Sequence, residues 1–252
     1  PWLSQLVGQI RDLTAKQEEM KAGEAYKQLD KQVGFLKKQL PFRSPHYYHF
    51  LDDHRAQKTI DPEAFTFQTT VDIDNPEEVE VAVKNALLLN GMFDDAEEKL
   101  FREKIFSADD IELWKGKVLH VELSARNKAH IDIRIPVGMT IAEAQSAFCK
   151  LIHATEDPSC VTPERIIFIT DAASQIYTAD DWYKRLDKEA VAEYREAYRK
   201  RGLDIDGRTM DVDFEPIESE EEKARRAANA VQYEQTYDGV PYEEIVKALV
   251  EL

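Results

Sequence analysis

The chain has 252 residues, of which 43% are hydrophobic, and a formal net charge of −16. This length supports one large core, whereas its longest apolar runs, such as 86–89, are too short to cross a membrane. The acidity argues against an ordinary basic surface for nucleic acid, but much of it is local, because residues 203–252 hold 5 Lys and Arg against 14 Asp and Glu.

Residues 3–39 carry apolar side chains at helical spacing, which predicts two helices or one long helix broken near Gly23. The remaining positions are rich in Lys, Glu and Gln, as expected of an amphipathic layer with one solvated face. We therefore predict that residues 1–60 form an N-terminal helical layer of the main domain. Its aromatic stretch FRSPHYYHF, at 42–50, is either a loop beside a nucleotide site or a packed strand.

The stretch FTFQTTVDID, at 65–74, is rich in β-branched and aromatic residues and predicts a strand. Residues i and i+2 of a strand point to the same face, so Asp72 and Asp74 project together. Adjacent like charges repel each other, and a bound cation would remove that cost. Asn75 and Pro76 suit the start of a helix, which places the acids at a sheet edge. The pair is either part of a metal site or two solvated acids.

The alternation of apolar and polar side chains predicts the rest of a core at 61–202. The elements expected after the first strand are a helix at 76–90, strands at 117–124 and 130–137, a helix at 140–154 that begins with a capping box from Thr140 to Glu143, and a strand at 165–170. The order strand, helix, strand, strand, helix, strand predicts an α+β fold. In it, a four-stranded antiparallel sheet carries two helices on one face.

The other face of this sheet is expected to be open and polar. By strand alternation, it carries Asp72, Asp74, His120, Glu122, Ser124, His130, Asp132 and Arg134. Carboxylates are the hard oxygen ligands that Mg²⁺ and Mn²⁺ prefer, and cationic side chains hold phosphate. The pattern therefore predicts a metal site beside phosphate-binding groups.

The last fifth of the chain, residues 203–252, is predicted to be an acidic linker followed by the start of a C-terminal helical domain, with helices at 218–234 and 241–252. The two cysteines, Cys149 and Cys160, lack the spacing of a zinc site and are expected to be free thiols in a reducing, cytoplasmic setting.

Several segments together resemble the N-terminal domain of virulence-associated E-type proteins, a branch of the archaeo-eukaryotic primase superfamily that is often fused to a helicase in mobile elements. The resemblance covers about residues 30–202. It rests on LKKQLP at 36–41, VDIDNP at 71–76, SARNKAHI at 124–131, and DPSCVTPERIIFITD followed by Tyr177 at 157–177.

The resemblance implies an RRM-like βαββαβ palm and a primase-polymerase activity that transfers nucleotides to a 3′-hydroxyl on a single-stranded template. The family's first motif matches Asp72 and Asp74, its second matches Ser124, Lys128 and His130, and its third matches Asp171. The implied catalytic residues are Asp72, Asp74, Asp171 and His130, with the three aspartates holding Mg²⁺ or Mn²⁺. The implied nucleotide-binding residues are Ser124, Arg126, Lys128, His130 and Arg134. The implied partners are nucleoside triphosphates, a single-stranded nucleic acid template and a C-terminal helicase domain of the same polypeptide, with no membrane involved.

Three other functions fit the same predicted topology. An RNA-binding module would stack bases on aromatic residues of the open face, where this sequence has acids and histidines. A replication-initiator nuclease would need two histidines one residue apart and a tyrosine nucleophile, and His120 with Glu122 supplies only half of that pair. The third alternative is a catalytically inactive nucleic-acid-binding or structural arm N-terminal to a helicase.

Overall fold

The computed structural model describes residues 2–92, 95–209, 236–237 and 240–241. The chain divides into two compact units, Pro1–Thr209 and Met210–Leu252. In the second unit, β7 (Thr236–Tyr237) pairs with β8 (Val240–Pro241) in antiparallel fashion. The helix expected at 218–234, and all but the first residue of that expected at 241–252, lie outside the described residues. No helix among the described residues is long and apolar enough to span a membrane.

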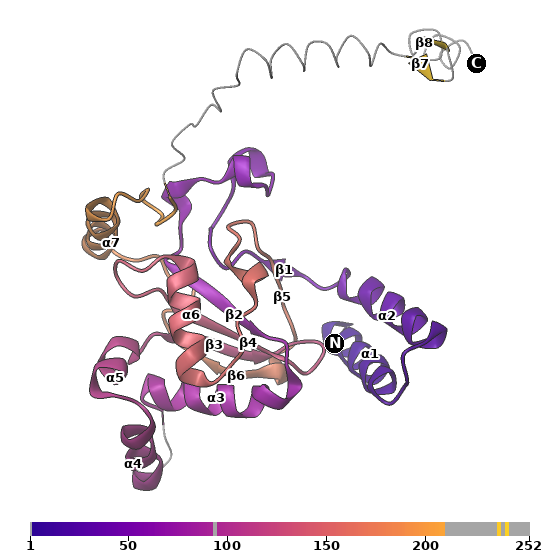
Figure 1. Cartoon of the computed structure of the whole chain (residues 1–252), viewed down its shortest axis with the longest axis horizontal. Helices are drawn as coiled ribbons and strands as arrows, with labels where there is room; N and C mark the ends of the chain where they lie inside the picture. Colours follow the sequence, from indigo (N-terminus) through magenta and orange to yellow (C-terminus); the bar gives the residue numbers. More distant parts are fainter. Residues whose placement is uncertain (1, 93–94, 210–235, 238–239, 242–252) are drawn as a thin grey trace, which may run out of the picture. The chain divides into compact units, whose positions relative to one another are not determined.

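The two helices expected at the start of the chain are present as α1 (Trp2–Glu18) and α2 (Glu24–Lys37). They pack on each other through a small apolar cluster of their own, which contains Leu6, Val7, Ile10 and Val33. Ala125 belongs to the same cluster, so this helical layer rests on the turn between two strands of the main sheet. Figure 1 shows the pair of helices beside that turn.

The central element of the first unit is a four-stranded sheet in the order β2-β4-β3-β6, with all neighbours antiparallel. Its strands are β2 (Gln68–Ile73), β3 (Val118–Leu123), β4 (Ala129–Arg134) and β6 (Gln175–Thr178). The predicted α+β class of the fold is thus confirmed.

The predicted fourth strand of the sheet was wrong. Of the stretch 165–170, only β5 (Ile167–Phe168) is a strand, and it pairs with β1 (Phe42–Arg43) in a separate two-stranded sheet. The place beside β3 is taken by β6, most of whose residues are exposed. A strand at an exposed sheet edge needs little apolar sequence, so β6 gave no alternating pattern to detect.

Helices α3 (Pro76–Asn90) and α6 (Ile141–Ile152) pack on each other and on one face of this sheet (Figure 1). The expected helix starts are confirmed, because the Asn75 side chain accepts the backbone N–H of Glu77 and a capping box links Thr140 with Glu143. The other helices are α4 (Ala96–Ile105), α5 (Ala108–Trp114), α7 (Lys188–Lys200) and the short 3-10 turns Leu51–Asp53, Gln57–Thr59, Pro62–Ala64, Pro158–Val161 and Ala172–Ser174.

The second face of the sheet is polar, as expected, but it is not open. His120, Glu122 and Asp132 are buried. Segments from both ends of the unit lie over them: Arg43 and the Trp182 indole donate to Asp132, and Thr170 donates to Glu122. Strand alternation assigns side chains to a face, but it carries no information on what covers that face.

Residues 203–209 were predicted to belong to the linker, but they form part of the first unit. Leu203 forms a β-bridge with Thr209, and the Tyr47 hydroxyl donates to Asp206 over 3.0 Å. The compact unit therefore continues through Thr209.

Candidate functional site

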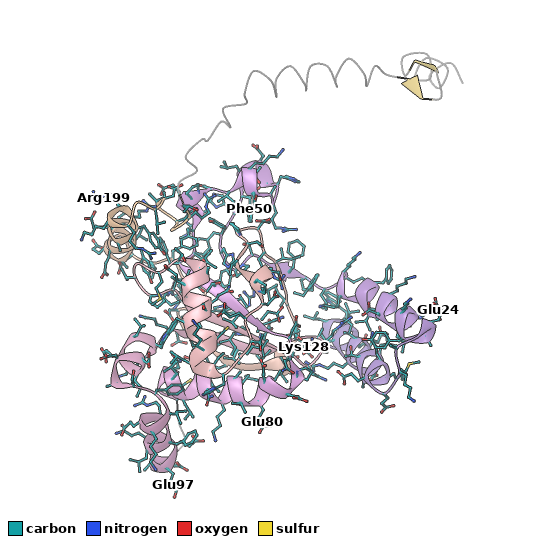
Figure 2. All side chains as sticks on the ribbon, in the orientation of Figure 1. Glu24, Phe50, Glu80, Glu97, Lys128 and Arg199 are labelled. Atoms are coloured by element: carbon teal, nitrogen blue, oxygen red, sulfur yellow. The ribbon has the colours of Figure 1, made fainter. Side chains whose placement is uncertain are left out.

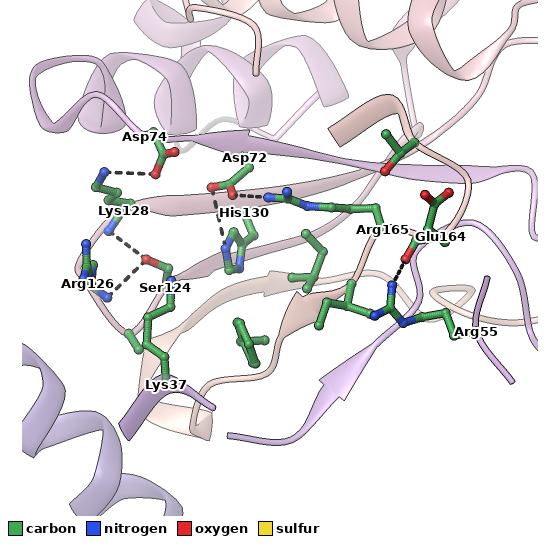
Figure 3. Close-up of a pocket in the computed structure, with 15 residues that line it drawn as sticks. Lys37, Arg55, Asp72, Asp74, Ser124, Arg126, Lys128, His130, Glu164 and Arg165 are labelled. Carbon is green, nitrogen blue, oxygen red and sulfur yellow. Dashed lines mark hydrogen bonds and ion pairs between the residues drawn. The ribbon is translucent and has the colours of Figure 1, made fainter. Parts of the chain in front are cut away.

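A cavity of about 540 Å³ opens where β2 ends, beside the turn between β3 and β4 (Figure 3). This volume lies within the range of about 300–1,000 Å³ that is usual for small-molecule sites. The cavity is lined by Lys37, Arg55, Asp72, Asp74, Ser124, Ala125, Arg126, Lys128, His130, Thr162, Glu164, Arg165, Ile166, Ile167 and Phe168. Six of the residues predicted for a site are in this set: Asp72, Asp74, Ser124, Arg126, Lys128 and His130.

Asp72 and Asp74 both line this cavity, but they differ in exposure. The side chain of Asp72 is 13% exposed, whereas that of Asp74 is 64% exposed. One oxygen of Asp72 lies 3.0 Å from the Arg165 guanidinium, and the other lies 3.7 Å from Nε2 of His130. Asp74 pairs with the Lys128 ammonium at 2.9 Å. Each acid of the pair therefore faces a cation supplied by the chain itself.

The turn between β3 and β4 positions two of the cations. The Ser124 hydroxyl accepts the backbone N–H groups of Arg126 and Lys128, over 3.2 and 3.1 Å. Asn127 adopts a left-handed conformation with φ of 57°, which asparagine tolerates better than most residues. Ser124 thus acts mainly as the organiser of the turn, and Arg126 and Lys128 project from it into the cavity. Figure 2 shows Lys128 at the end of the sheet that lies nearest to α1 and α2.

His130 is oriented by a buried carboxylate. Its Nδ1 lies 3.1 Å from Oε1 of Glu122, and Thr170 donates to the other oxygen of Glu122 over 2.7 Å. Burial raises the pKa of Glu122, but the hydrogen bonds from His120, His130 and Thr170 outweigh it and hold that pKa well below its ordinary value. Glu122 is therefore ionised, and it fixes the His130 ring with Nε2 toward Asp72.

Three cations of this cavity were not predicted from the sequence: Lys37 at the end of α2, Arg55 and Arg165. With Arg126 and Lys128 they make five Lys and Arg against the three acids of the lining, in a chain whose net charge is −16. Burial, and next the charge of Arg126, lower the pKa of Lys37. Lys37 and Arg165 lie inside segments that carry the family resemblance, which was the only available signal for them.

Two predicted residues do not line this cavity. Asp171 accepts a hydrogen bond from Ser174, which is the main cause of its lowered pKa, and Ser174 in turn accepts a bond from Arg11. Arg134 pairs across the sheet with Gln68, four residues before Asp72 on β2, or about 14 Å at 3.4 Å per residue. Its guanidinium pairs with Asp181 instead. The sheet register thus separates Arg134 from the paired acids, although both lie on one face.

A group of side chains that could hold a metal ion lies at the cavity edge and consists of Asp72, Asp157 and Cys160, whose ligand atoms are within 4.8 Å of one another. Burial raises the pKa of the Cys160 thiol, and sulfur is a soft ligand that Mg²⁺ and Mn²⁺ do not favour. The carboxylates of Asp72, Asp74 and Asp157 remain as donors, and such hard oxygens fit Mg²⁺ or Mn²⁺.

No family model, no curated protein and no solved structure matches this chain. What the cavity binds is therefore inferred from its own side chains. Carboxylates at a strand end, next to a surplus of Lys and Arg, suit a ligand that combines phosphate groups with a divalent cation.

Proposed function

We propose that this chain is a metal-dependent nucleotidyltransferase of the primase-polymerase kind, which adds nucleotides to a 3′-hydroxyl on a single-stranded template. One observation carries the proposal: Asp72 and Asp74 line the same cavity as five Lys and Arg. Carboxylates alone would repel a nucleoside triphosphate, and cations alone would bind it without activating any group. The combination fits both requirements of nucleotidyl transfer.

Six of the lining residues have a role in this proposal. Asp72 and Asp74 would hold Mg²⁺ or Mn²⁺, which when bound lowers the pKa of an attacking hydroxyl and neutralises charge on the triphosphate. Lys37, Arg126 and Lys128 bind phosphate oxygens through charge-assisted hydrogen bonds. His130, held by Glu122, presents Nε2 as a further hydrogen-bond group beside Asp72.

The finer topology belongs to the same proposal. We assign β2, α3, β3, β4 and α6 to the first five elements of an RRM-like palm, with the last strand replaced by β6 at the other edge of the sheet. Asp171 as a third metal ligand and Arg134 as a phosphate ligand have no support from their positions, so the proposed site does not depend on them. A C-terminal helicase domain of the same polypeptide is an expectation from the resemblance, and a cytoplasmic setting is an expectation from the two free cysteines.

The proposal is tested by incubating the chain with Mn²⁺, labelled nucleotides and a single-stranded template. The variant Asp72→Asn with Asp74→Asn should lose transfer. Asp74 is mostly exposed, so the loss of its pair with Lys128 should cost at most about 1 kcal/mol of unfolding free energy, whereas Asp72, which is 13% exposed and lies beside Arg165 and His130, should cost more. A matched control, Glu103→Gln with Glu112→Gln, removes the same charge from exposed positions on α4 and α5 and should keep transfer. Equal activity of the two double variants would refute the assignment.

A second candidate is a nucleic-acid-binding or structural arm without transfer. The observation that favours it is the neutralisation of both acids by Arg165 and Lys128. It predicts binding of single-stranded nucleic acid that is insensitive to chelators, together with no incorporation of nucleotides under any metal.

A further inference from the structure

Arg165 occupies the place of a cation between two carboxylates. Its Nη2 lies 3.0 Å from Oδ2 of Asp72 and 3.6 Å from Oδ2 of Asp157, while its Nη1 donates to the Ser159 hydroxyl over 2.8 Å. Figure 3 shows the guanidinium reaching across the cavity to Asp72. The side chain is 26% exposed, so it borders the cavity and is not locked in the core.

A divalent ion cannot use both carboxylates while Arg165 holds them. The ligand atoms of Asp72 and Asp157 lie close enough for one ion to bridge them. An ion bound there would have to displace the guanidinium. Once displaced, Arg165 would have lost its carboxylate partners in a cavity with four other Lys and Arg, of which Lys128 and Arg126 are paired with Asp74 and Asp30, and an anion that enters would supply a new partner.

On the basis of the proposed function, we propose that Arg165 is an exchangeable cation of this site. In the metal-free protein it neutralises Asp72 and Asp157. When a divalent ion takes its place, Arg165 moves onto a phosphate group of the bound nucleotide, and Asp157 serves as a metal-binding carboxylate that the sequence analysis did not identify. Metal and phosphate therefore bind cooperatively.

The cooperativity has a simple origin. Metal alone must break the Arg165–Asp72 pair and leave Arg165 without a partner, and an anion that draws Arg165 away leaves Asp72 without one. When both bind, every charge has a partner. Couplings between two ligands are commonly about 5- to 150-fold in affinity, and by linkage each ligand strengthens the other by the same factor.

The experiment measures Mn²⁺ affinity of the full chain by electron paramagnetic resonance, with and without sulfate as the phosphate probe, at constant ionic strength. Sulfate should strengthen Mn²⁺ binding to the wild type by at least roughly fivefold. Arg165→Gln should bind Mn²⁺ about tenfold more tightly than the wild type in the absence of sulfate, and its response to sulfate should largely vanish.

Arg55→Gln is the matched control, because Arg55 lines the same cavity but donates to the backbone carbonyl of Glu164. Arg55→Gln removes the same charge as Arg165→Gln. Because Arg55 donates to a backbone carbonyl and not to Asp72 or Asp157, the variant should keep the Mn²⁺ affinity within about twofold of the wild type and keep the sulfate effect. In the Arg165→Gln background, Asp157→Asn should weaken Mn²⁺ binding, whereas Asp171→Asn should not.

The outcomes separate the two proposals. If Arg165→Gln and Arg55→Gln change the Mn²⁺ affinity equally, or if sulfate has no effect on the wild type, the exchange is refuted while the metal site stands. If Asp157→Asn has no effect, the role of Asp157 is refuted. If the wild type binds no Mn²⁺ at all, or if Asp72→Asn with Asp74→Asn leaves Mn²⁺ binding intact, the proposed function itself fails.

Discussion

The buried pair of Arg43 and Asp132 offers a sharp test of how the polar sheet face is covered. Asp132 lies 2.8 Å from the Arg43 guanidinium, also accepts the Trp182 indole N–H over 2.7 Å, and is only 2% exposed. Burial lowers the pKa of Arg43, but the charge of Asp132, together with Tyr183 and the charge of Glu122, more than offsets this and raises that pKa above its ordinary value. The two segments that carry Arg43 and Trp182 thus meet on one carboxylate.

Asp132→Asn keeps the shape of the side chain but leaves the buried Arg43 guanidinium without a counter-charge. Removing one partner of a buried pair costs about 3–5 kcal/mol, a large share of the roughly 5–15 kcal/mol that stabilises a domain. Replacing both partners, as in Arg43→Met with Asp132→Leu, leaves no unpaired charge and should recover much of that loss. The two-residue variant should therefore be more stable than Asp132→Asn.

The measurement is urea unfolding followed by far-ultraviolet circular dichroism and by tryptophan fluorescence, with the free energy of unfolding extrapolated to water. Fluorescence adds a local readout, because Trp182 stacks on His120 with ring centroids 4.0 Å apart. A loss below about 1 kcal/mol for Asp132→Asn, as for a solvated surface pair, would contradict the burial argument. The argument would also be contradicted if the loss of unfolding free energy in Arg43→Met with Asp132→Leu equalled the sum of the losses in Arg43→Met alone and Asp132→Leu alone.

Two further predictions concern stability. Burial lowers the pKa of His46 from 6.5 to about 4. As the pH falls, the unfolded chain therefore binds a proton at His46 before the folded chain does. The free energy of unfolding should fall by about 3 kcal/mol as the pH drops from 6.5 to 4. In His46→Gln this part of the pH dependence should be absent, and parallel stability curves for the two proteins would contradict the reasoning. Gly207→Ala should cost on the order of 1–3 kcal/mol more unfolding free energy than Gly116→Ala. Both glycines have positive φ, so the backbone strain of the two variants is similar. A Cβ at Gly207 would lie 2.8 Å from the Tyr198 ring, whereas a Cβ at Gly116 would meet no atom within 4 Å. Thermal unfolding of the two variants measures this difference, and equal losses would show that Tyr198 yields.

The sequence by itself determined the elements whose causes are local. The two N-terminal helices, the helix starts at Asn75 and Thr140 and the hairpin from 118 to 134 follow from helical spacing, capping residues and strand alternation, which all act within a few residues. The shared facing of Asp72 and Asp74 on one strand, and the closeness of Lys128 and His130 on the hairpin, belong to this group, whereas the pairing of β2 with β4 that brings Asp72 opposite His130 does not. Six of the fifteen residues that line the cavity were predicted from the sequence.

The tertiary structure decided which segments meet. A short apolar run such as 165–170 fits several strand positions, and only the packed chain showed that β5 pairs with β1 while β6 completes the sheet. Strand parity could not show that Arg43 and Trp182 cover the polar face. Nor could it show that Lys37, Arg55 and Arg165 enter the cavity from distant parts of the chain while Asp171 turns toward Ser174. Charge placement across such distances depends on long-range packing, for which a single sequence carries no periodic pattern.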